Sequence, residues 1–455
     1  MSVHVSDCGH FFRNDDGSPF FYLGDTVWLL FNKLKEEDAR ELFADRAAKG
    51  FTVIQSVVFR DLFTPNTPNA YGDPPFVDEQ AMFRVDMNPK WIDYVKRITA
   101  IAAEYGLAMG LLPTWGDKWN THSNSAGPVI MDRDKARAYG RFLSDELAAH
   151  DNVIWILGGD SPILTQEHAD TIAAMADGIR SGGSRDRLMT FHPSGLGSSE
   201  IFHSQTWLDF NAIQTSHYKP NIPGYITIER LHANRLAKPC LDMEPNYEGC
   251  PMFIRRPRDG SSALEPVFGA YDVRKSLYRT VLAGAAGFTY GAEPIRQLYR
   301  DGDRIHIFGD YPMPTWKQAL SLPGSSQLSF LIARLTERDY FSRVPAQELF
   351  LPLRQHGAWP DYQTVGMSFA GQENTDPVSH IRVARCAHGS YLMAYTPVRQ
   401  VITLDTSGLK PGTLTVTLWD PETGAQTDRY TADNTGRLIV VPHRDLDTFI
   451  TVDVR

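Results

Sequence analysis

Eight short, largely apolar segments follow one another along this chain, and segments with helical periodicity separate most of them. The apolar segments span residues 20–25, 52–59, 107–115, 152–157, 188–192, 212–217, 239–244 and 287–291. Alternating strand and helix patterns are typical of α/β proteins with a parallel sheet, and eight repeats predict a (β/α)8 TIM barrel. The segment between the fifth and sixth strands reads poorly as a helix, so we expect the weakest connection there.

The stretch Asn152–Asp160 shows how these strands end. Residues 153–157 are all apolar, two glycines follow, and Asp160 comes next. An unbroken apolar run closed by glycine is typical of a strand buried on both faces, and glycine lets the chain leave the sheet in a tight turn. Asp160 then lies at the carboxyl end of a strand, where TIM barrels hold their active sites. The alternative is that Asp160 only caps the turn at Ser161-Pro162.

The last quarter of the chain has a different pattern. The chain has 455 residues, which is long for one domain. Helical periodicity stops after residue 345, and short strand patterns separated by Gly, Pro and Asn turns take over. These patterns lie at residues 391–395, 401–404, 414–419, 437–441 and 448–454. We expect a barrel domain over residues 1–340, with a short β prelude at its start, and a C-terminal β-sandwich over residues 345–455.

Composition narrows the range of partners and compartments. The net charge is −9 and no basic run stands out, so nucleic acid is not an expected partner. No apolar run reaches the roughly 18 residues of a membrane span. Residues 1–16 lack the apolar core of a signal peptide, so we expect a cytoplasmic protein without a membrane partner. The four scattered cysteines predict reduced thiols, with a Cys240–Cys250 disulfide as the alternative.

Carboxylates, aromatic rings and hydrogen-bonding side chains gather at the predicted strand ends. Glycoside hydrolysis needs one carboxylic acid to protonate the leaving oxygen and a second carboxylate as nucleophile or base. Asp160 follows the fourth strand and Glu244 ends the seventh, so they face each other across the rim with room for a glycosidic bond between them. The side chains expected to bind the sugar are Asp25, Trp28, Gln55, Trp115, Trp119, His122, His192, His217, Tyr218, Tyr247 and Tyr290.

Five motifs between residues 10 and 340 resemble the apiosidase-like glycoside hydrolases, glycoside hydrolase family 140, formerly a domain of unknown function. The motifs are Tyr22–Trp28, Tyr71–Phe76, Asn152–Asp160, Leu241–Gly249, and Trp316 with Leu322–Ser325. The resemblance implies an acid/base at Asp160 and a nucleophile at Glu244. Many retaining barrel glycosidases have Asn-Glu where this chain has Gly159-Asp160. The residue that would contact the sugar 2-hydroxyl is therefore unassigned. Aspartate is shorter than glutamate, which changes how far the acid reaches. We expect retention of the anomeric configuration, with inversion as the alternative.

The resemblance also implies a substrate class. The known substrate of the family is apiose in the side chains of pectic rhamnogalacturonan II, so we expect a plant cell-wall oligosaccharide as the partner. Residues 391–395 and Trp419–Gly424 resemble the module named as a collagen-binding domain of collagenases. We expect a structural, accessory sandwich that packs on the barrel.

Rival carboxylates remain open from the residues alone. Glu248 is the alternative nucleophile, four residues after Glu244, and Glu293 is the alternative acid. Glu244 itself could be a buried carboxylate paired with Arg255 or Arg256 in the following loop.

Other functions also remain open. A metal site is one alternative, because three histidines are expected on one rim: His122, His192 and His217. No HxH or HExxH spacing supports it, and we expect neither a metal nor another cofactor. The alternatives to a glycosidase are a metal-dependent hydrolase and a non-catalytic carbohydrate-binding protein on a barrel scaffold.

Overall fold

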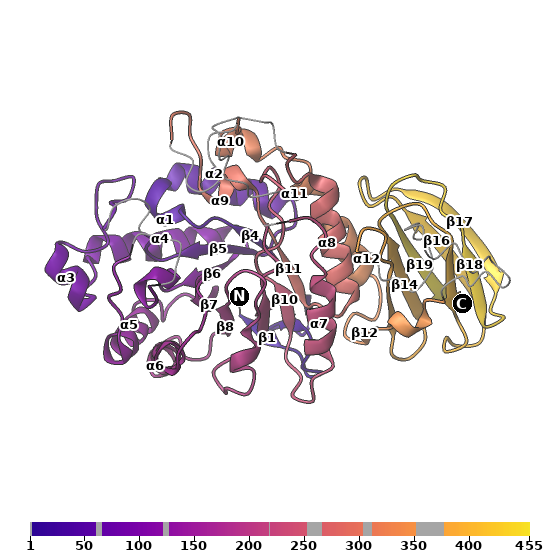
Figure 1. Ribbon diagram of the computed structural model, residues 1–455, viewed down its shortest axis with the longest axis horizontal. Helices are drawn as coiled ribbons and strands as arrows, with labels where there is room; N and C mark the ends of the chain where they lie inside the picture. The colour runs from indigo at the N-terminus through magenta and orange to yellow at the C-terminus, as the bar shows by residue number, and fades with distance from the viewer. Residues whose placement is uncertain are drawn as a thin grey trace, which may run out of the picture.

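The computed structural model describes residues 2–60, 66–121, 127–217, 219–252, 266–303, 312–351 and 377–455. Figure 1 shows a barrel surrounded by helices and, beside it, a smaller unit of antiparallel strands drawn in yellow. The helices α8 (Ala270–Leu282) and α12 (Ser329–Thr336) lie between the two units. The predicted fold class, a TIM barrel followed by a β-sandwich, is confirmed.

Eight parallel strands form the barrel sheet in the order β8-β7-β6-β5-β4-β11-β10-β9. They are β4 (Tyr22–Thr26), β5 (Val53–Val57), β6 (Ala108–Leu112), β7 (Val153–Gly158), β8 (Met189–His192), β9 (Asn211–Ile213), β10 (Cys240–Asp242) and β11 (Gly287–Tyr290). Each overlaps one predicted strand. All of their residues are buried, because helices cover the outer face and side chains fill the interior.

The barrel is nearly closed between β8 and β9, the two ends of the strand order, which lie next to each other. The segment that connects them contains the short 3-10 helix η2 (Ser199–Phe202) where other connections have an α-helix. A single antiparallel bridge joins Ser198 to Ile213 there. The fifth-to-sixth connection is therefore the irregular one, as the sequence pattern predicted.

The helices around the barrel follow the predicted periodic segments. The longer ones, besides α8 and α12, are α2 (Glu36–Ala48), α4 (Pro89–Glu104), α5 (Arg133–Glu146), α6 (Gln166–Arg180) and α7 (Gly224–His232). Shorter elements are α1 (Leu30–Lys33), α3 (Glu79–Arg84), η1 (Gly116–Lys118), α9 (Glu293–Arg296), α10 (Trp316–Ala319) and α11 (Gly324–Gln327). Local chemistry sets their starts: Thr165, for example, accepts a hydrogen bond from the His168 N–H and begins α6.

The N-terminal prelude closes the end of the barrel that is opposite the strand carboxyl ends. It consists of β1 (Val3–Val5), β2 (Phe12–Asn14) and β3 (Pro19–Phe20). The Phe12 ring lies 6.3 Å from the ring of Tyr22, which begins β4, and 5.1 Å from that of Phe210, just before β9. An apolar plug at this end leaves the other end for chemistry.

The C-terminal unit has a six-stranded sheet, in the order β12-β13-β14-β19-β16-β17, and a two-stranded sheet of β15 and β18. Its strands are β12 (Arg343–Pro345), β13 (Arg382–Cys386), β14 (Tyr391–Thr396), β15 (Ile402–Asp405), β16 (Thr413–Trp419), β17 (Gln426–Asp433), β18 (Arg437–Val440) and β19 (Thr448–Val454), with the 3-10 helix η3 (Gln347–Leu349) after β12. Three of them, β12, β13 and β17, were not predicted. No apolar alternation marks β17, because it alternates exposed and half-buried residues at the sheet edge, and pairing with β16 defines it.

One face of the six-stranded sheet packs on the barrel through α8. The ring of Tyr395 stacks on that of Tyr278 with centroids 4.7 Å apart. Arg274 Nε lies 3.1 Å from Asp447 Oδ2, and Arg274 Nη2 lies 3.0 Å from Asp447 Oδ1, with both side chains buried. The opposite face of this sheet forms a separate apolar core with the two-stranded sheet. The sandwich therefore has its own core and an extensive contact with the barrel.

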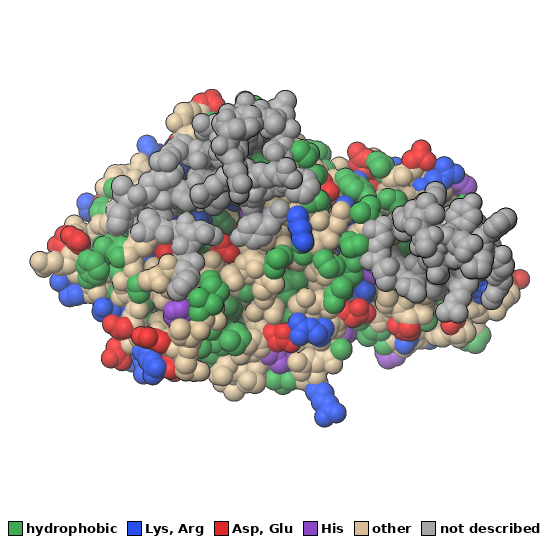
Figure 2. Space-filling view, in the orientation of Figure 1, with side chains coloured by type: hydrophobic (Ala, Val, Ile, Leu, Met, Phe, Trp, Pro, Cys, Tyr) green, Lys and Arg blue, Asp and Glu red, His purple; other side chains and the backbone are tan. Residues whose placement is uncertain are grey.

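Acidic and basic side chains are interspersed on the face of the molecule that Figure 2 shows. None of the helices in the described part of the chain has the length and apolar character needed to cross a bilayer. All four cysteines, Cys240 and Cys250 included, are free thiols, so the alternative disulfide does not form.

Candidate active site

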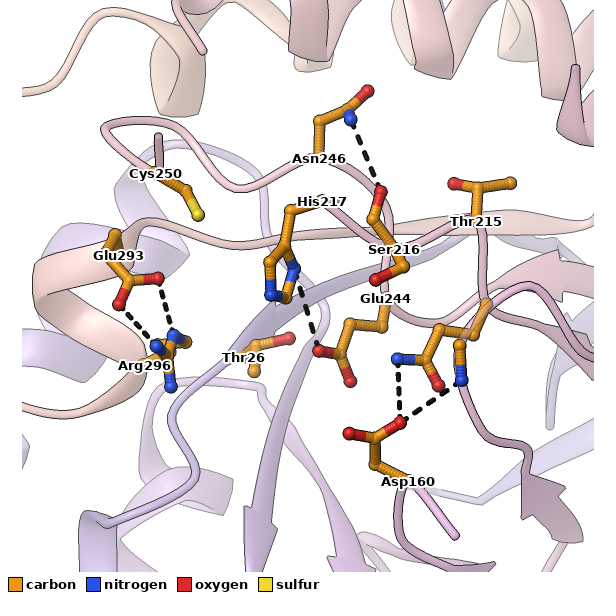
Figure 3. A network of polar contacts seen from close by, with 12 residues as sticks. Thr26, Asp160, Thr215, Ser216, His217, Glu244, Asn246, Cys250, Glu293 and Arg296 are labelled. Carbon is orange, nitrogen blue, oxygen red and sulfur yellow. Dashed lines mark hydrogen bonds and ion pairs between the residues drawn. The ribbon is translucent and has the colours of Figure 1, made fainter. Parts of the chain in front are cut away.

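Four side chains meet at the carboxyl ends of four neighbouring strands. Asp160 follows β7, His192 ends β8, His217 follows β9 and Glu244 follows β10. Figure 3 shows the carboxyl groups of Asp160 and Glu244 pointing toward one another, with His217 on the far side of Glu244. The barrel thus brings together residues that are up to 84 positions apart (244 − 160 = 84).

The turn after β7 requires its two glycines. Gly158 and Gly159 have φ angles of +96° and +104°, and a Cβ on Gly158 would lie 2.4 Å from the His192 carbonyl oxygen. Asp160 follows with φ at +48°, a sparsely populated conformation for a non-glycine residue. This sharp turn directs the Asp160 carboxylate back toward the centre of the rim instead of into the next connection.

Asp160 sits in surroundings that favour its protonated form. Its Oδ1 accepts hydrogen bonds from the Gly195 N–H and the Gln214 Nε2, both at 3.2 Å. Burial, and then the charge of Glu244, raise its pKa to about 6, although His192, Gln214 and Arg60 oppose the shift.

Glu244 sits in surroundings that favour its ionised form. His192 Nε2 lies 3.2 Å from Glu244 Oε2, and His217 Nδ1 lies 3.9 Å from Glu244 Oε1. Burial alone would raise the pKa of Glu244. The neighbouring His192, together with the charge of Arg296, outweighs burial, so the net shift of that pKa is downward. Two facing carboxyl groups with opposite shifts form a pair of one acid and one carboxylate.

The two histidines are held in defined orientations. The Pro193 carbonyl oxygen lies 2.9 Å from His192 Nδ1 and can only accept, so Nδ1 is a donor, and Nε2, which faces Glu244, favours the ionised carboxylate when it too carries a proton. The His217 ring stacks on Tyr247 with centroids 4.7 Å apart. Burial lowers the pKa of His217 to about 4, so this ring is neutral near pH 7.

An aromatic wall borders the carboxylates. Trp28 contacts the ring of Trp115 at 5.2 Å and that of His192 at 5.5 Å. The Arg60 guanidinium lies 4.0 Å above the Trp115 ring. Burial, followed by the charge of Arg296, lowers the pKa of Arg60 to about 10, so it remains a cation beside the two carboxylates.

Sequence reasoning missed Arg60 and Gln214, which both follow strand ends. Arg60 comes three residues after the end of β5, and Gln214 comes directly after β9. The strand-end rule that selected Asp160 and Glu244 would have found both of them. A hydrophilic residue just after an apolar run is too common for that rule alone to rank them.

A family model described as "Apiosidase-like, catalytic domain" matches residues 6–342. The chain belongs to the apiosidase-like family. A solved structure named "Glycoside hydrolase" is 25% identical to it, with a TM-score of 0.82 over 100% of this chain and 97% of that chain. A glycoside hydrolase family 5 structure from Bacteroides vulgatus is 24% identical, with a TM-score of 0.84 over 100% of this chain and 92% of that chain. No curated protein matches the chain. These findings make this apiosidase-like protein a glycosidase.

Several predicted sugar-binding residues of the apiosidase-like barrel have structural contacts instead. Asp25 lies within β4 and points outward, where Arg46 of α2 donates to its Oδ2 at 2.6 Å; both side chains are fully buried. Tyr290, at the end of β11, donates its hydroxyl to Glu248 Oε2 at 2.7 Å. These positions do not support the predicted sugar contacts of Asp25 and Tyr290, because successive strand residues face opposite sides of the sheet.

Two further predicted residues support the site from below or beside it. Gln55 lies inside the barrel, where it accepts from the Tyr22 hydroxyl at 3.1 Å and donates to the Met243 carbonyl at 3.3 Å. Trp119 is buried and donates its Nε1–H to the Gly158 carbonyl at 3.2 Å, which fixes the turn before Asp160. The remaining two predicted sugar-binding residues, His122 and Tyr218, lie outside the described residues.

The rival carboxylates are engaged elsewhere in the apiosidase-like barrel. Glu248 accepts from Tyr290 and, at 3.2 Å, from the Gly324 N–H that begins α11. Glu293 accepts from Arg296 Nε at 2.6 Å and from Gln297 Nε2 at 2.9 Å, and it is fully buried. Over the described ranges, no group of three or more His, Cys, Asp or Glu side chains is arranged to hold a metal ion.

Proposed function

We propose that this protein hydrolyses a glycosidic bond in plant cell-wall oligosaccharides, with Glu244 as the nucleophile and Asp160 as the acid/base. The observation that carries the proposal is the opposite environment of the two facing carboxyl groups. His192 and Arg296 favour a charged Glu244, whereas burial and the charge of Glu244 favour a protonated Asp160. That division of protons is what a two-carboxylate glycosidase needs before the first step.

The chemistry then follows in two steps. Glu244 attacks the anomeric carbon while Asp160 gives its proton to the leaving oxygen, and a glycosyl ester forms. Esterification removes the negative charge of Glu244, which is one of the causes that raise the pKa of Asp160. Asp160 therefore becomes a stronger acid and remains ionised, so it can take a proton from the water that hydrolyses the ester.

The substrate class rests on the family. The name of the family, and the resemblance of the five motifs to it, favour an apiose-containing pectic oligosaccharide as the substrate. On the same motifs we propose that the protein is a member of glycoside hydrolase family 140. A panel of 4-nitrophenyl furanosides and pyranosides, with pectic oligosaccharides included, tests this assignment. Release of a sugar that continues in EDTA supports it. Loss of activity in EDTA would instead favour a metal-dependent hydrolase, and binding without any release would favour a carbohydrate-binding protein.

Asp160→Asn will slow substrates with poor leaving groups most. Removal of a general acid costs typically 10²–10⁴-fold, roughly, where the leaving oxygen needs a proton, whereas an activated dinitrophenyl leaving group does not need one. In the wild-type enzyme, kcat/KM on poor leaving groups will fall as the pH rises through about 6, the pKa of Asp160, because the proton donor is lost. Initial-rate assays on two aryl glycosides that differ only in their leaving group measure both effects. An equal loss on both leaving groups would refute the acid role.

The first sugar released will keep the anomeric configuration of the substrate. Asp160 on β7 and Glu244 on β10 occupy the fourth and seventh barrel strands, the positions used by retaining barrel glycosidases. The Gly158-Gly159 turn, with φ angles of +96° and +104°, is expected to offset the shorter aspartate side chain. Proton NMR recorded before mutarotation identifies the first anomer. The opposite anomer would make Glu244 a general base.

A further inference from the structure

We propose that Asp242 is a positioning residue, whose carboxylate holds the backbone of Glu244 at the place where the nucleophile must act. The inference rests on the proposed function, since it assigns a task to a residue that acts through Glu244. Asp242 ends β10 two residues before Glu244, yet its side chain does not enter the space between the catalytic pair. It is bonded instead to Thr215, which lies two residues after the end of the neighbouring strand β9.

Three hydrogen bonds converge on this one carboxylate. Asp242 Oδ1 accepts from the Glu244 N–H and from the Thr215 N–H, both at 3.3 Å, and Oδ2 accepts from the Thr215 hydroxyl at 2.6 Å. A buried carboxylate that is satisfied by backbone donors fixes those donors, because each would otherwise be left without a partner.

Both polar backbone groups of Glu244 are held in this way. Its N–H is bound by Asp242, and its carbonyl oxygen accepts from the Ser216 N–H at 2.7 Å. Pro245 follows directly and restricts the next backbone angle. The nucleophile thus stands on a backbone with little freedom, although it lies beyond the last residue of its strand.

The same carboxylate joins two of the four strand ends that carry the site, those of β9 and β10. Thr215 lies between Gln214, which bonds Asp160, and His217, which lies beside Glu244. Asp242 therefore connects the segment that carries Gln214, the hydrogen-bond partner of Asp160, to the backbone of Glu244. Helix α7 packs closely on this pair, since a Cβ on its first residue, Gly224, would lie 2.3 Å from Thr215 Cγ2 and 3.7 Å from Asp242 Oδ2.

The test compares Asp242→Ala with Asp242→Asn in the full-length protein. Asparagine keeps an oxygen in the Oδ1 position and can donate to the Thr215 hydroxyl, whereas alanine leaves both N–H groups unbound. We expect Asp242→Ala to lower kcat on the best 4-nitrophenyl glycoside about 100-fold with KM nearly unchanged, since a misplacement near 1 Å costs on that order. Asp242→Asn should restore most of kcat.

Asp209 provides the matched control. It is a half-buried carboxylate at the opposite end of β9, where it accepts from the Met189 N–H at 2.7 Å and from Arg180 Nη2 at 2.6 Å. Asp209→Asn should lower the melting temperature and leave kcat unchanged. If it lowers kcat as much as Asp242→Ala, or if Asp242→Ala keeps kcat within threefold of wild type, the positioning role is wrong.

Hydrogen exchange separates this inference from the proposed function. Peptides that cover residues 213–217 and 242–248 should exchange faster in Asp242→Ala than in wild type, and at the wild-type rate in Asp209→Asn. A wild-type protein without glycosidase activity would refute the function but leave this readout intact, and unchanged exchange in Asp242→Ala would refute the positioning role. If the alanine variant does not fold, Thr215→Val should lower kcat and Thr215→Ser should restore it; equal rates for the two would contradict the proposal.

Discussion

Glu244→Gln will lower kcat by at least three orders of magnitude, on the order of the loss seen when a catalytic group is removed. Glutamine keeps the shape of the side chain but cannot carry the charge that His192 and Arg296 stabilise on Glu244. Without a nucleophilic carboxylate no glycosyl ester forms. Single-turnover rates on an activated aryl glycoside measure the effect without interference from product release.

Glu248→Gln is the matched control for this prediction. It makes the same chemical change four residues away, on a carboxylate that is engaged by Tyr290 and the Gly324 N–H. We expect it to lower the melting temperature and to leave kcat within a few-fold of wild type. A tenth of wild-type activity in Glu244→Gln, or the larger loss in Glu248→Gln, would transfer the nucleophile role to Glu248.

A chain that ends at residue 340 will be insoluble or strongly destabilised. Truncation removes the sheet that covers α8, so it exposes the ring of Tyr278 and leaves the buried Arg274 without Asp447. Removing one partner of a buried ion pair costs about 3–5 kcal/mol by itself, and the lost apolar contact adds to that. Expression yield in the soluble fraction and thermal unfolding of any soluble product measure the outcome.

Asp447→Ala separates the contact from the rest of the sandwich. It removes the carboxylate that binds Arg274 and accepts from the Tyr395 hydroxyl at 3.0 Å, while the sandwich keeps its own core. We expect a large drop in the free energy of unfolding with the same kcat for the folded fraction. A soluble, fully active truncation, together with polysaccharide binding by the isolated sandwich, would show instead that this unit is a carbohydrate-binding module.

The barrel could be predicted because a strand that is buried on both faces has an almost entirely apolar sequence. Each of its strands is a short apolar run, and the runs alternate with helical periods. Asp160 and Glu244 could be selected because the carboxyl ends of parallel strands meet at one rim. The edge strand β17 has no apolar run that would predict it, since only backbone pairing with β16 defines it.

The direction of each strand-end side chain was decided by the tertiary structure. Asp25 and Asp160 both follow a Gly in a Gly-Asp pair near the end of an apolar run. Asp25 is still inside its strand, and its phase in the pleat points it to Arg46 behind the sheet. Asp160 comes two residues after its strand, and a left-handed turn points it to the centre of the rim.

The division of protons between the two carboxyl groups was likewise beyond the sequence. Local sequence determines that Asp160 and Glu244 reach the rim, as residue types at strand ends. Burial and the charge of Glu244 raise the pKa of Asp160, whereas His192 at the end of β8 and Arg296 in α9 lower the pKa of Glu244. Such interactions depend on distance and burial in space, and separation along the chain contains no information about either.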